Sequence, residues 1–195
     1  MSTVKSKKLQ VGTDATATNN FTIYQPATPD GTLRIGVGNA DSPTEVGRFN
    51  SNGYVATNAP AFRATLSGTQ NISDSTETKV QFDTKTFDTA SCYDNTTNYR
   101  FTPNVAGYYQ VNLTLDFRGT SKTSILGYIY KNGTEDSRIF TTRAATSAYE
   151  ILSGSVLIYM NGTTDYIEAY GQIIASANNN FNINSQFSAF LVRGT

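Results

Sequence analysis

The sequence contains no histidine, and this absence removes the residue that most often serves as a general base and as a zinc ligand. Cysteine is nearly absent as well, because Cys92 is the only one and cannot form a disulfide within the chain. Without a histidine partner Cys92 is also a poor nucleophile, so we expect it to be structural. Stability must then come from packing and from association between chains.

Charge is sparse and balanced, with 15 Lys and Arg residues against 15 Asp and Glu residues. A formal charge of zero argues against a surface that binds nucleic-acid phosphates by releasing counterions, and it favours self-association. Lysines stand at positions 5, 7 and 8, but no apolar signal-peptide core follows them, and no apolar run is long enough to span a membrane. We therefore expect an assembled protein without a secretion signal of its own, without membrane insertion and without a nucleic-acid partner.

Carboxylates are the remaining option for acid–base chemistry, and their spacing is uninformative. The Asp and Glu residues are scattered, with no spacing that selects the pair a glycoside hydrolase requires. No cluster of the Asp-x-Asp kind indicates a calcium site. The sequence thus predicts a protein that is not an enzyme, with no catalytic residue, no metal and no cofactor.

Aromatic and β-branched residues are plentiful, including 12 Tyr and 11 Phe, and they suit a pleated, half-buried surface. The clearest alternation runs from Tyr109 to Phe117, where odd-numbered residues are apolar and even-numbered residues are polar. One side of this strand should face a core and the other should face water. Asn132-Gly133 and Asn161-Gly162 are strong hairpin signals. Residues 59–195 therefore read as an all-β sandwich or jelly roll.

Residues 1–58 have a different texture, in which short apolar pairs such as Phe21 and Ile23 alternate with dense turn signals. Strands this short bury little surface alone, so we expect this segment to pack against copies of itself or against another protein. Its end is marked by Asn58-Ala59-Pro60, since proline holds the preceding residue in an extended conformation. We interpret residues 1–58 as a turn-rich β segment used for attachment.

Segment 155–160 is apolar on both faces, as are parts of segments 124–130 and 187–192. Such a strand in an antiparallel sheet has something covering its outer face, and another subunit is the simplest cover. The candidate residues for this interface are Tyr128, Tyr130, Tyr159 and Phe190.

Other tyrosines lie in or beside polar loops, where an aromatic ring can stack on a sugar. The candidates for such surface recognition are Tyr93, Tyr99 and Tyr149.

A series of short motifs follows in order along the second region. They are Pro60-Ala61-Phe62-Arg63-Ala64, Val80-Gln81-Phe82-Asp83, Tyr93-Asp94, Phe101-Thr102-Pro103, Gly107-Tyr108-Tyr109, Tyr130-Lys131-Asn132-Gly133, Gly154-Ser155-Val156, Asp165-Tyr166-Ile167 and Phe187-Ser188-Ala189-Phe190-Leu191-Val192. Together they resemble the globular head of the complement C1q and tumour-necrosis-factor family, with departures at Thr164 and Ala189, where that family often has glycine. The resemblance implies a ten-stranded jelly roll that forms a tight homotrimer through an aromatic seam and serves recognition.

The N-terminal region carries motifs of another kind: Asn20-Phe21-Thr22-Ile23, Pro29-Asp30-Gly31-Thr32-Leu33-Arg34-Ile35-Gly36 and Phe49-Asn50-Ser51-Asn52-Gly53-Tyr54-Val55. These are similar to short repeats in bacteriophage fibre and virion-surface proteins, where they precede a C1q-like tip. The resemblance implies a virion-surface location, attachment to other virion proteins through residues 1–58, and adhesion of a trimeric tip to a host-surface glycan or protein. Two alternatives are a capsid-decorating or head-fibre protein with a structural role, and a soluble bacterial C1q-like lectin.

Overall fold

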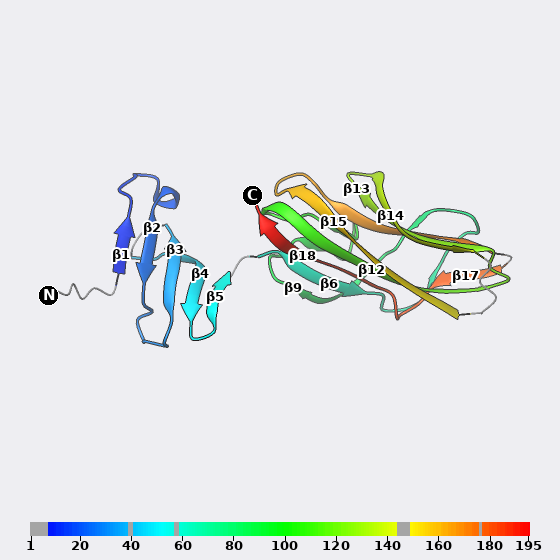
Figure 1. Cartoon of the computed structure of the whole chain (residues 1–195), viewed down its shortest axis with the longest axis horizontal. Coiled ribbons are helices and arrows are strands. Elements are labelled where there is room, and N and C mark those ends of the chain that lie inside the picture. The colour runs from blue at the N-terminus through cyan, green and yellow to red at the C-terminus, as the bar shows by residue number, and fades with distance from the viewer. Residues whose placement is uncertain (1–7, 39–40, 57–58, 144–148, 176) are drawn as a thin grey trace. The chain divides into compact units, whose positions relative to one another are not determined.

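The computed structural model describes residues 8–38, 41–56, 59–143, 149–175 and 177–195. These residues form strands and loops apart from one turn of 3-10 helix, η1 (Ala17–Asn19), so the fold is all-β (Figure 1). The chain divides into two compact units, Met1–Asn58 and Ala59–Thr195. Within the described ranges, no helix has the length and apolar character needed to cross a membrane.

The N-terminal unit is a single antiparallel sheet whose five strands follow one another in chain order. The strands are β1 (Lys8–Val11), β2 (Phe21–Tyr24), β3 (Leu33–Val37), β4 (Thr44–Asn50) and β5 (Gly53–Ala56). Turn chemistry fixes the connections: the Asp30 side chain accepts a hydrogen bond from the Thr32 amide at 3.0 Å before β3. Gly53 opens β5 with a φ of 112°, a value that L-residues rarely adopt.

The second unit consists of two antiparallel sheets. The β13 sheet has the order β10-β11-β16-β13-β14, with β8 also paired to β16. Its strands are β8 (Thr78–Lys79), β10 (Tyr93–Asp94), β11 (Arg100–Phe101), β13 (Ser124–Lys131), β14 (Thr134–Arg143) and β16 (Ile167–Ile174).

The β12 sheet has the order β7-β17-β12-β18-β6-β9, with β15 also paired to β12. Its strands are β6 (Ala61–Thr65), β7 (Gln70–Asn71), β9 (Thr84–Asp88), β12 (Ala106–Thr120), β15 (Tyr149–Asn161), β17 (Ala177–Phe181) and β18 (Gln186–Gly194). The described part of this unit therefore holds thirteen strand segments, four of them only two residues long, where the resemblance implies ten strands. The architecture is that of a jelly-roll sandwich.

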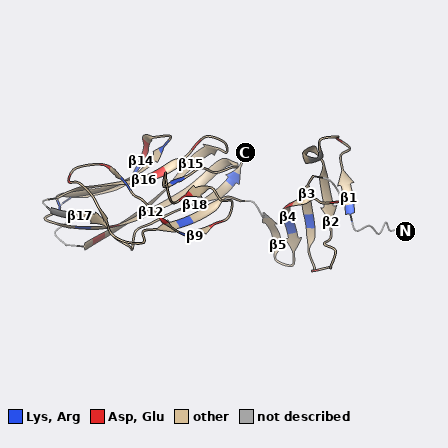
Figure 2. Cartoon of the chain, turned by 180° about the vertical axis from the view of Figure 1, so that it is seen from behind, with Lys and Arg blue, Asp and Glu red and all other residues tan. Residues whose placement is uncertain are grey.

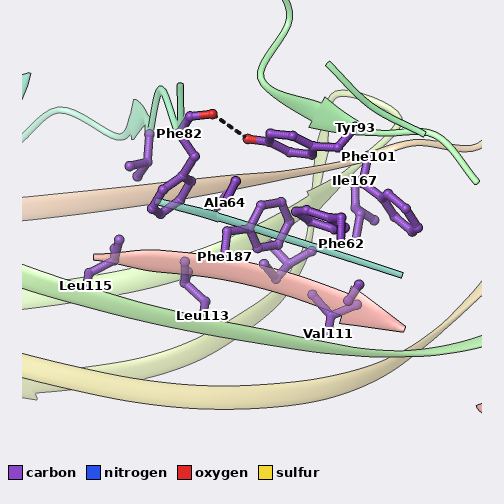
Figure 3. Close-up of a cluster of buried hydrophobic side chains, with 14 of the residues drawn as sticks. Phe62, Ala64, Phe82, Tyr93, Phe101, Val111, Leu113, Leu115, Ile167 and Phe187 are labelled. Atoms are coloured by element: carbon purple, nitrogen blue, oxygen red, sulfur yellow. Dashed lines mark hydrogen bonds between the residues drawn. The ribbon is translucent and has the colours of Figure 1, made fainter. Parts of the chain in front are cut away.

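The core of this unit lies between the two sheets and is rich in aromatic rings (Figure 3). As the alternation predicts, the odd-numbered residues of β12 from Tyr109 to Phe117 point into it and are at most 1% exposed. The Phe62 ring from β6 stacks on Tyr93 at 4.4 Å and on Phe101 at 4.6 Å between ring centroids. Phe187 from β18 meets Phe62 edge-on at 5.0 Å. This unit thus has a complete core of its own.

One even-numbered residue of β12 departs from the predicted pattern, because Asp116 is fully buried instead of facing water. The turn at 182–185 covers it: the Ser185 hydroxyl accepts a hydrogen bond from the Asp116 amide at 3.0 Å, and Asn184 donates to the carboxylate at 2.8 Å. Arg118 completes an ion pair with the carboxylate at 2.6 Å. The buried charge is therefore paired and hydrogen-bonded, which offsets the free-energy cost of burying it.

Candidate functional site

The outer face of the β12 sheet carries a cluster of exposed apolar side chains on three adjacent strands. The cluster consists of Tyr108 on β12, Leu157 and Tyr159 on β15, and Phe190 on β18, and we call it the assembly face. Strand register brings these residues together, since Tyr108 is opposite Tyr159, and Gln110 is opposite both Leu157 and Phe190. The four side chains are 43 to 53% exposed.

Three of the four side chains of the assembly face are aromatic, the residue type enriched at the centre of protein–protein interfaces. Charged groups border them, because Lys131 Nζ lies 5.8 Å from the Tyr159 ring centre and Arg193 is opposite Tyr108. The Tyr108 and Tyr159 rings meet edge-on at 5.5 Å. Nearby polar groups bond within the sheet, as the hydroxyls of Thr114 and Ser153 do at 2.8 Å. Burying a large apolar side chain completely stabilises a protein by about 1.5–3 kcal/mol, so covering this face would stabilise an assembly.

The four predicted interface residues do not form one seam. Tyr159 and Phe190 lie on the assembly face, whereas Tyr128 and Tyr130 lie on β13 in the other sheet. The prediction for Tyr128 has to be corrected, because its side chain is only 1% exposed and is already covered within the chain.

The cover over Tyr128 and Tyr130 comes from neighbouring strands of the β13 sheet. The Arg138 guanidinium lies 5.2 Å from the Tyr128 ring centre, and Tyr130 stacks on Tyr170 at 4.0 Å. The Tyr130 hydroxyl donates a hydrogen bond to Glu77, and this bond, with burial, raises the pKa of Tyr130. Side chains from neighbouring strands of the same chain therefore cover the tyrosines of β13, and no second subunit is needed to explain why both faces of this strand are apolar.

The prediction for Tyr93 as a surface-recognition residue also has to be corrected. Its ring is only 3% exposed, within the aromatic core, and its hydroxyl donates to the Phe82 carbonyl at 3.1 Å (Figure 3). Burial raises the pKa of Tyr93 far above its ordinary value. The polar sequence around Tyr93 suggested a surface loop, but its own ring points inward.

Tyr99 and Tyr149 are accessible and occupy different elements. Tyr149 begins β15, is 64% exposed, and has the Arg118 guanidinium 4.1 Å from its ring centre. Tyr99 adopts a φ of 51° and lines a hollow of about 180 Å³ together with Asp83 and Gln81. Tyr99 is partly exposed and Tyr149 is exposed, and an accessible ring beside polar side chains suits stacking on a sugar, so both residues stay candidates for recognition.

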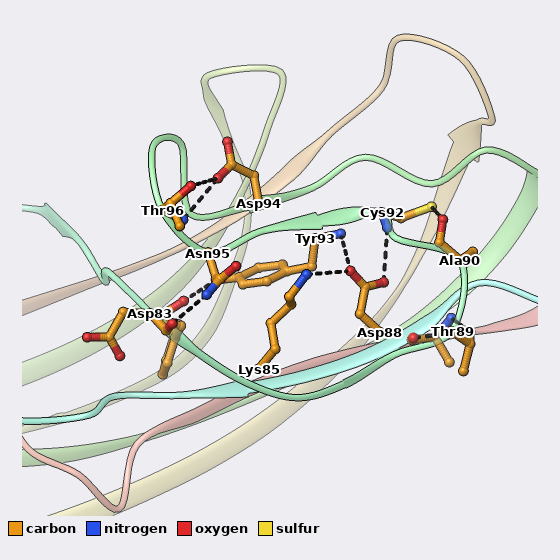
Figure 4. A network of polar contacts seen from close by, with 12 residues as sticks. Asp83, Lys85, Asp88, Thr89, Ala90, Cys92, Tyr93, Asp94, Asn95 and Thr96 are labelled. Atoms are coloured by element: carbon orange, nitrogen blue, oxygen red, sulfur yellow. Dashed lines mark hydrogen bonds and ion pairs between the residues drawn. The ribbon is translucent and has the colours of Figure 1, made fainter.

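The carboxylates of Asp83, Asp88 and Asp94 accept hydrogen bonds that hold the surrounding loops in place (Figure 4). Asp88 accepts from the amides of Cys92 and Tyr93 at 2.9 and 3.1 Å and pairs with Lys85 at 3.3 Å. Asp94 accepts from the amides of residues 96 to 98, and these bonds hold its pKa well below the usual range. The lowered pKa of Asp94 makes this carboxylate poorly suited to proton transfer at neutral pH.

Asp83 and Cys92 fit the same structural role. Burial alone would raise the pKa of Asp83, but hydrogen bonds from the Ser67 amide and hydroxyl lower it overall. Burial raises the pKa of the Cys92 thiol, which donates to the Ala90 carbonyl at 3.3 Å. Across the described ranges, no group of three or more His, Cys, Asp or Glu side chains is placed to hold a metal ion.

Two members of the assembly face were missed by sequence reasoning. Leu157 lies within the doubly apolar segment 155–160, of which only Tyr159 is predicted from the sequence to be an interface residue. Tyr108 precedes the alternating run of β12, and only its pairing with Tyr159 places it on the outer face. Cross-strand register was the missing information.

Comparison with known proteins identifies a family and solved structures of similar fold. The family model described as C1q domain matches residues 61–192. Crystal structures of murine APRIL at pH 8.5, 8.0 and 5.0 are similar, each with a TM-score of 0.51, at 12%, 12% and 10% identity. Each match covers 69% of this chain and 99% of the APRIL chain. At such identities the likeness concerns the fold alone. No curated protein matches the sequence.

Proposed function

The chain belongs to the C1q domain family, and we propose that it is a homotrimeric, non-enzymatic adhesion protein of a bacteriophage virion surface. In this proposal the jelly roll binds a glycan or protein on the host surface, and residues 1–58 serve attachment and assembly. The observation that carries the proposal is the exposed apolar cluster of the assembly face, which gives each copy an apolar surface for another copy.

Trimerisation matters to adhesion because three weak sites on one particle bind a surface together. Linked sites can exceed the affinity of a single site by about 10²–10⁴-fold. Tyr149 begins β15, ten residues before Tyr159 on the same strand, and Tyr99 lies in the turn between β10 and β11 of the other sheet. Their partial exposure is compatible with contacts to a ligand while the assembly face is covered.

Cell binding by Tyr159→Lys tests the proposal. A lysine on the assembly face should break the trimer and lower apparent affinity for bacterial cells by at least about 100-fold, through loss of avidity. Ile183→Lys is the matched control, because Ile183 is 55% exposed but lies in the 182–185 turn. Equal binding of both variants across a panel of bacterial cells would contradict trimeric adhesion.

The virion location is supported by the N-terminal motifs, such as Pro29 to Gly36, which resemble those of phage fibres. Negative-stain images of phage particles labelled with an antibody to this protein test that location. Label at fibre tips would support adhesion, whereas label over the head would favour capsid decoration. Recovery of the protein only from uninfected bacteria would contradict both virion functions and favour the lectin alternative.

A further inference from the structure

One face of the N-terminal sheet is apolar across all five strands. Strand register puts the same side of each strand on this face, from β1 through to β5. Its large side chains, which we call the N-terminal apolar face, are Leu9, Val11, Phe21, Ile23, Leu33, Ile35, Val37, Phe49 and Tyr54. Seven of the nine are 37 to 59% exposed. No charged side chain of the described strands shares this side of the sheet.

The opposite side of the same sheet is polar and satisfies its own charges. Glu45 on β4 pairs with Arg34 on β3 at 3.1 Å and with Arg48 at 2.6 Å. Figure 2 shows basic residues on β1, β3 and β4. Gly36 lies close under Pro43, so closely that an added Cβ would stand 2.7 Å from the proline Cβ. This side is suited to water, and the missing second layer of the sheet belongs on the apolar side.

We propose that the N-terminal apolar face packs against the same face of two other copies of this chain, so that three sheets enclose a shared core. This inference rests on the trimer of the proposed function. The chemistry of the face selects its occupant: an uncharged aliphatic and aromatic surface is complementary to itself. It offers no charged group to a nucleic acid or to an acidic or basic peptide.

The size of the face favours copies that are already linked. Five strands about 4.8 Å apart, averaging about five residues that each rise about 3.3 Å, give a face of roughly 400 Å². A stable complex of separate proteins buries about 800 Å² on each partner, so this face is too small to recruit an independent partner tightly. Only four residues separate β5 from β6. Chains joined through their jelly rolls therefore bring these faces together at an effective concentration in roughly the millimolar range.

The absence of tryptophan from the sequence provides a clean reporter. Phe21→Trp in the full chain places one fluorophore on the N-terminal apolar face, and Tyr24→Trp places one on the opposite side. We expect acrylamide to quench the tryptophan of Phe21→Trp at least about threefold less strongly in the otherwise unchanged chain than in the same chain carrying Tyr159→Lys. The tryptophan of Tyr24→Trp should be quenched alike in both.

A second pair of variants tests the face directly, without touching the jelly roll. Leu33→Lys lies on the N-terminal apolar face at 48% exposure, and Val55→Lys lies on the opposite side at 43%. Added to Phe21→Trp, Leu33→Lys should raise quenching to the level of the Tyr159→Lys chain while the assembly keeps its mass. Val55→Lys should leave the quenching low.

The outcomes separate this inference from the proposed function, provided that solution mass is measured on every sample. A trimer whose tryptophan at position 21 is fully quenched overturns the inference and leaves the proposed function intact. Weak quenching of the tryptophan at position 21 in a monomeric Tyr159→Lys chain also overturns the inference, because the cover then comes from within the same chain. The inference is also overturned if acrylamide quenching of the tryptophan at position 21 stays weak after Leu33→Lys is added. A monomeric wild-type chain contradicts the proposed function itself.

Discussion

The two units of the chain differ in how far they bury their apolar side chains. In the jelly roll, rings such as Phe62 and Phe187 are fully buried between two sheets of one chain. In the N-terminal sheet, Phe21 and Phe49 are 49% and 45% exposed on a single layer. A sheet needs a second layer to bury its apolar face, and only the jelly roll supplies one from its own sequence.

Because of this difference, we expect the jelly roll to fold without a partner and the N-terminal sheet to need one. The jelly roll can fold on its internal core and still present the assembly face, whose Tyr159 is 43% exposed, to other copies. None of the described residues of the N-terminal unit belongs to a buried hydrophobic core, and short strands of this kind are marginally stable without a covering layer. Substitutions should therefore act on folding in one unit and on association in the other.

The largest effect is expected from Phe187→Ala in the jelly-roll core. Removing a fully buried aromatic ring leaves a cavity and should lower the free energy of unfolding by about 3–5 kcal/mol. Urea unfolding followed by circular dichroism measures the change, in a Tyr159→Lys chain so that dissociation does not contribute. Phe49→Ala in the same chain is the comparison and should cost well under half as much. Equal losses of unfolding free energy for Phe187→Ala and Phe49→Ala would contradict the view that only the jelly roll has an internal core.

The next effect is expected from Tyr159→Lys on the assembly face. A charge placed at the centre of an apolar interface should weaken association by at least about 2 kcal/mol per chain, while the core rings stay packed. Sedimentation velocity at micromolar concentration measures the loss of trimer, with Ile183→Lys as the control. An unchanged sedimentation coefficient for Tyr159→Lys would place the interface elsewhere.

A smaller, pH-dependent effect is expected from Asp94→Asn. Backbone amides of Thr97 and Thr96 lower the pKa of Asp94 in the folded jelly roll, so its carboxylate stabilises the fold above the unfolded pKa of about 3.9. That contribution is lost as the pH falls through the folded pKa. The stability difference between wild type and Asp94→Asn, obtained from urea unfolding, should be full at pH 7 and shrink below about pH 4. A constant difference from pH 7 to the acid limit would show that ionisation of Asp94 is not involved.

The smallest effect on stability is expected from Tyr149→Ala. Loss of the Arg118 contact with the ring should cost only about 0.5–1 kcal/mol, as is usual for exposed cation–π pairs. Binding to cells should nevertheless fall several-fold at unchanged trimer mass, whereas Val55→Lys in the N-terminal sheet should bind as wild type does. The opposite ranking of these two variants in a cell-binding assay would move recognition to the N-terminal unit.

Sequence periodicity predicted those features that depend on one strand at a time. The odd-numbered residues of β12, from Tyr109 to Phe117, are buried as predicted. Features that depend on neighbouring strands were missed: Asp116 is buried by a turn nearly seventy positions away in sequence, and Tyr128 is covered by Arg138. Tyr93 was misplaced because its polar sequence neighbours conceal an inward-pointing ring.

The same limit applies to the candidate surfaces. The doubly apolar segment 155–160 predicts an interface at Tyr159, and the structure leaves this side chain exposed, whereas Tyr108 joins the assembly face through its pairing with β15. In the N-terminal unit, the short apolar pairs were visible in the sequence. Their collection onto one side of one sheet follows from the register of four hairpins, which residue spacing alone does not determine.

The central claim is that this C1q-family chain works as a trimer, and its mass in solution tests that claim most directly. Light scattering coupled to size-exclusion chromatography at micromolar concentration should give three times the 21.2 kDa mass of the chain. A mass of one chain under the same conditions would contradict the account, because both exposed apolar faces would then lack the cover proposed for them.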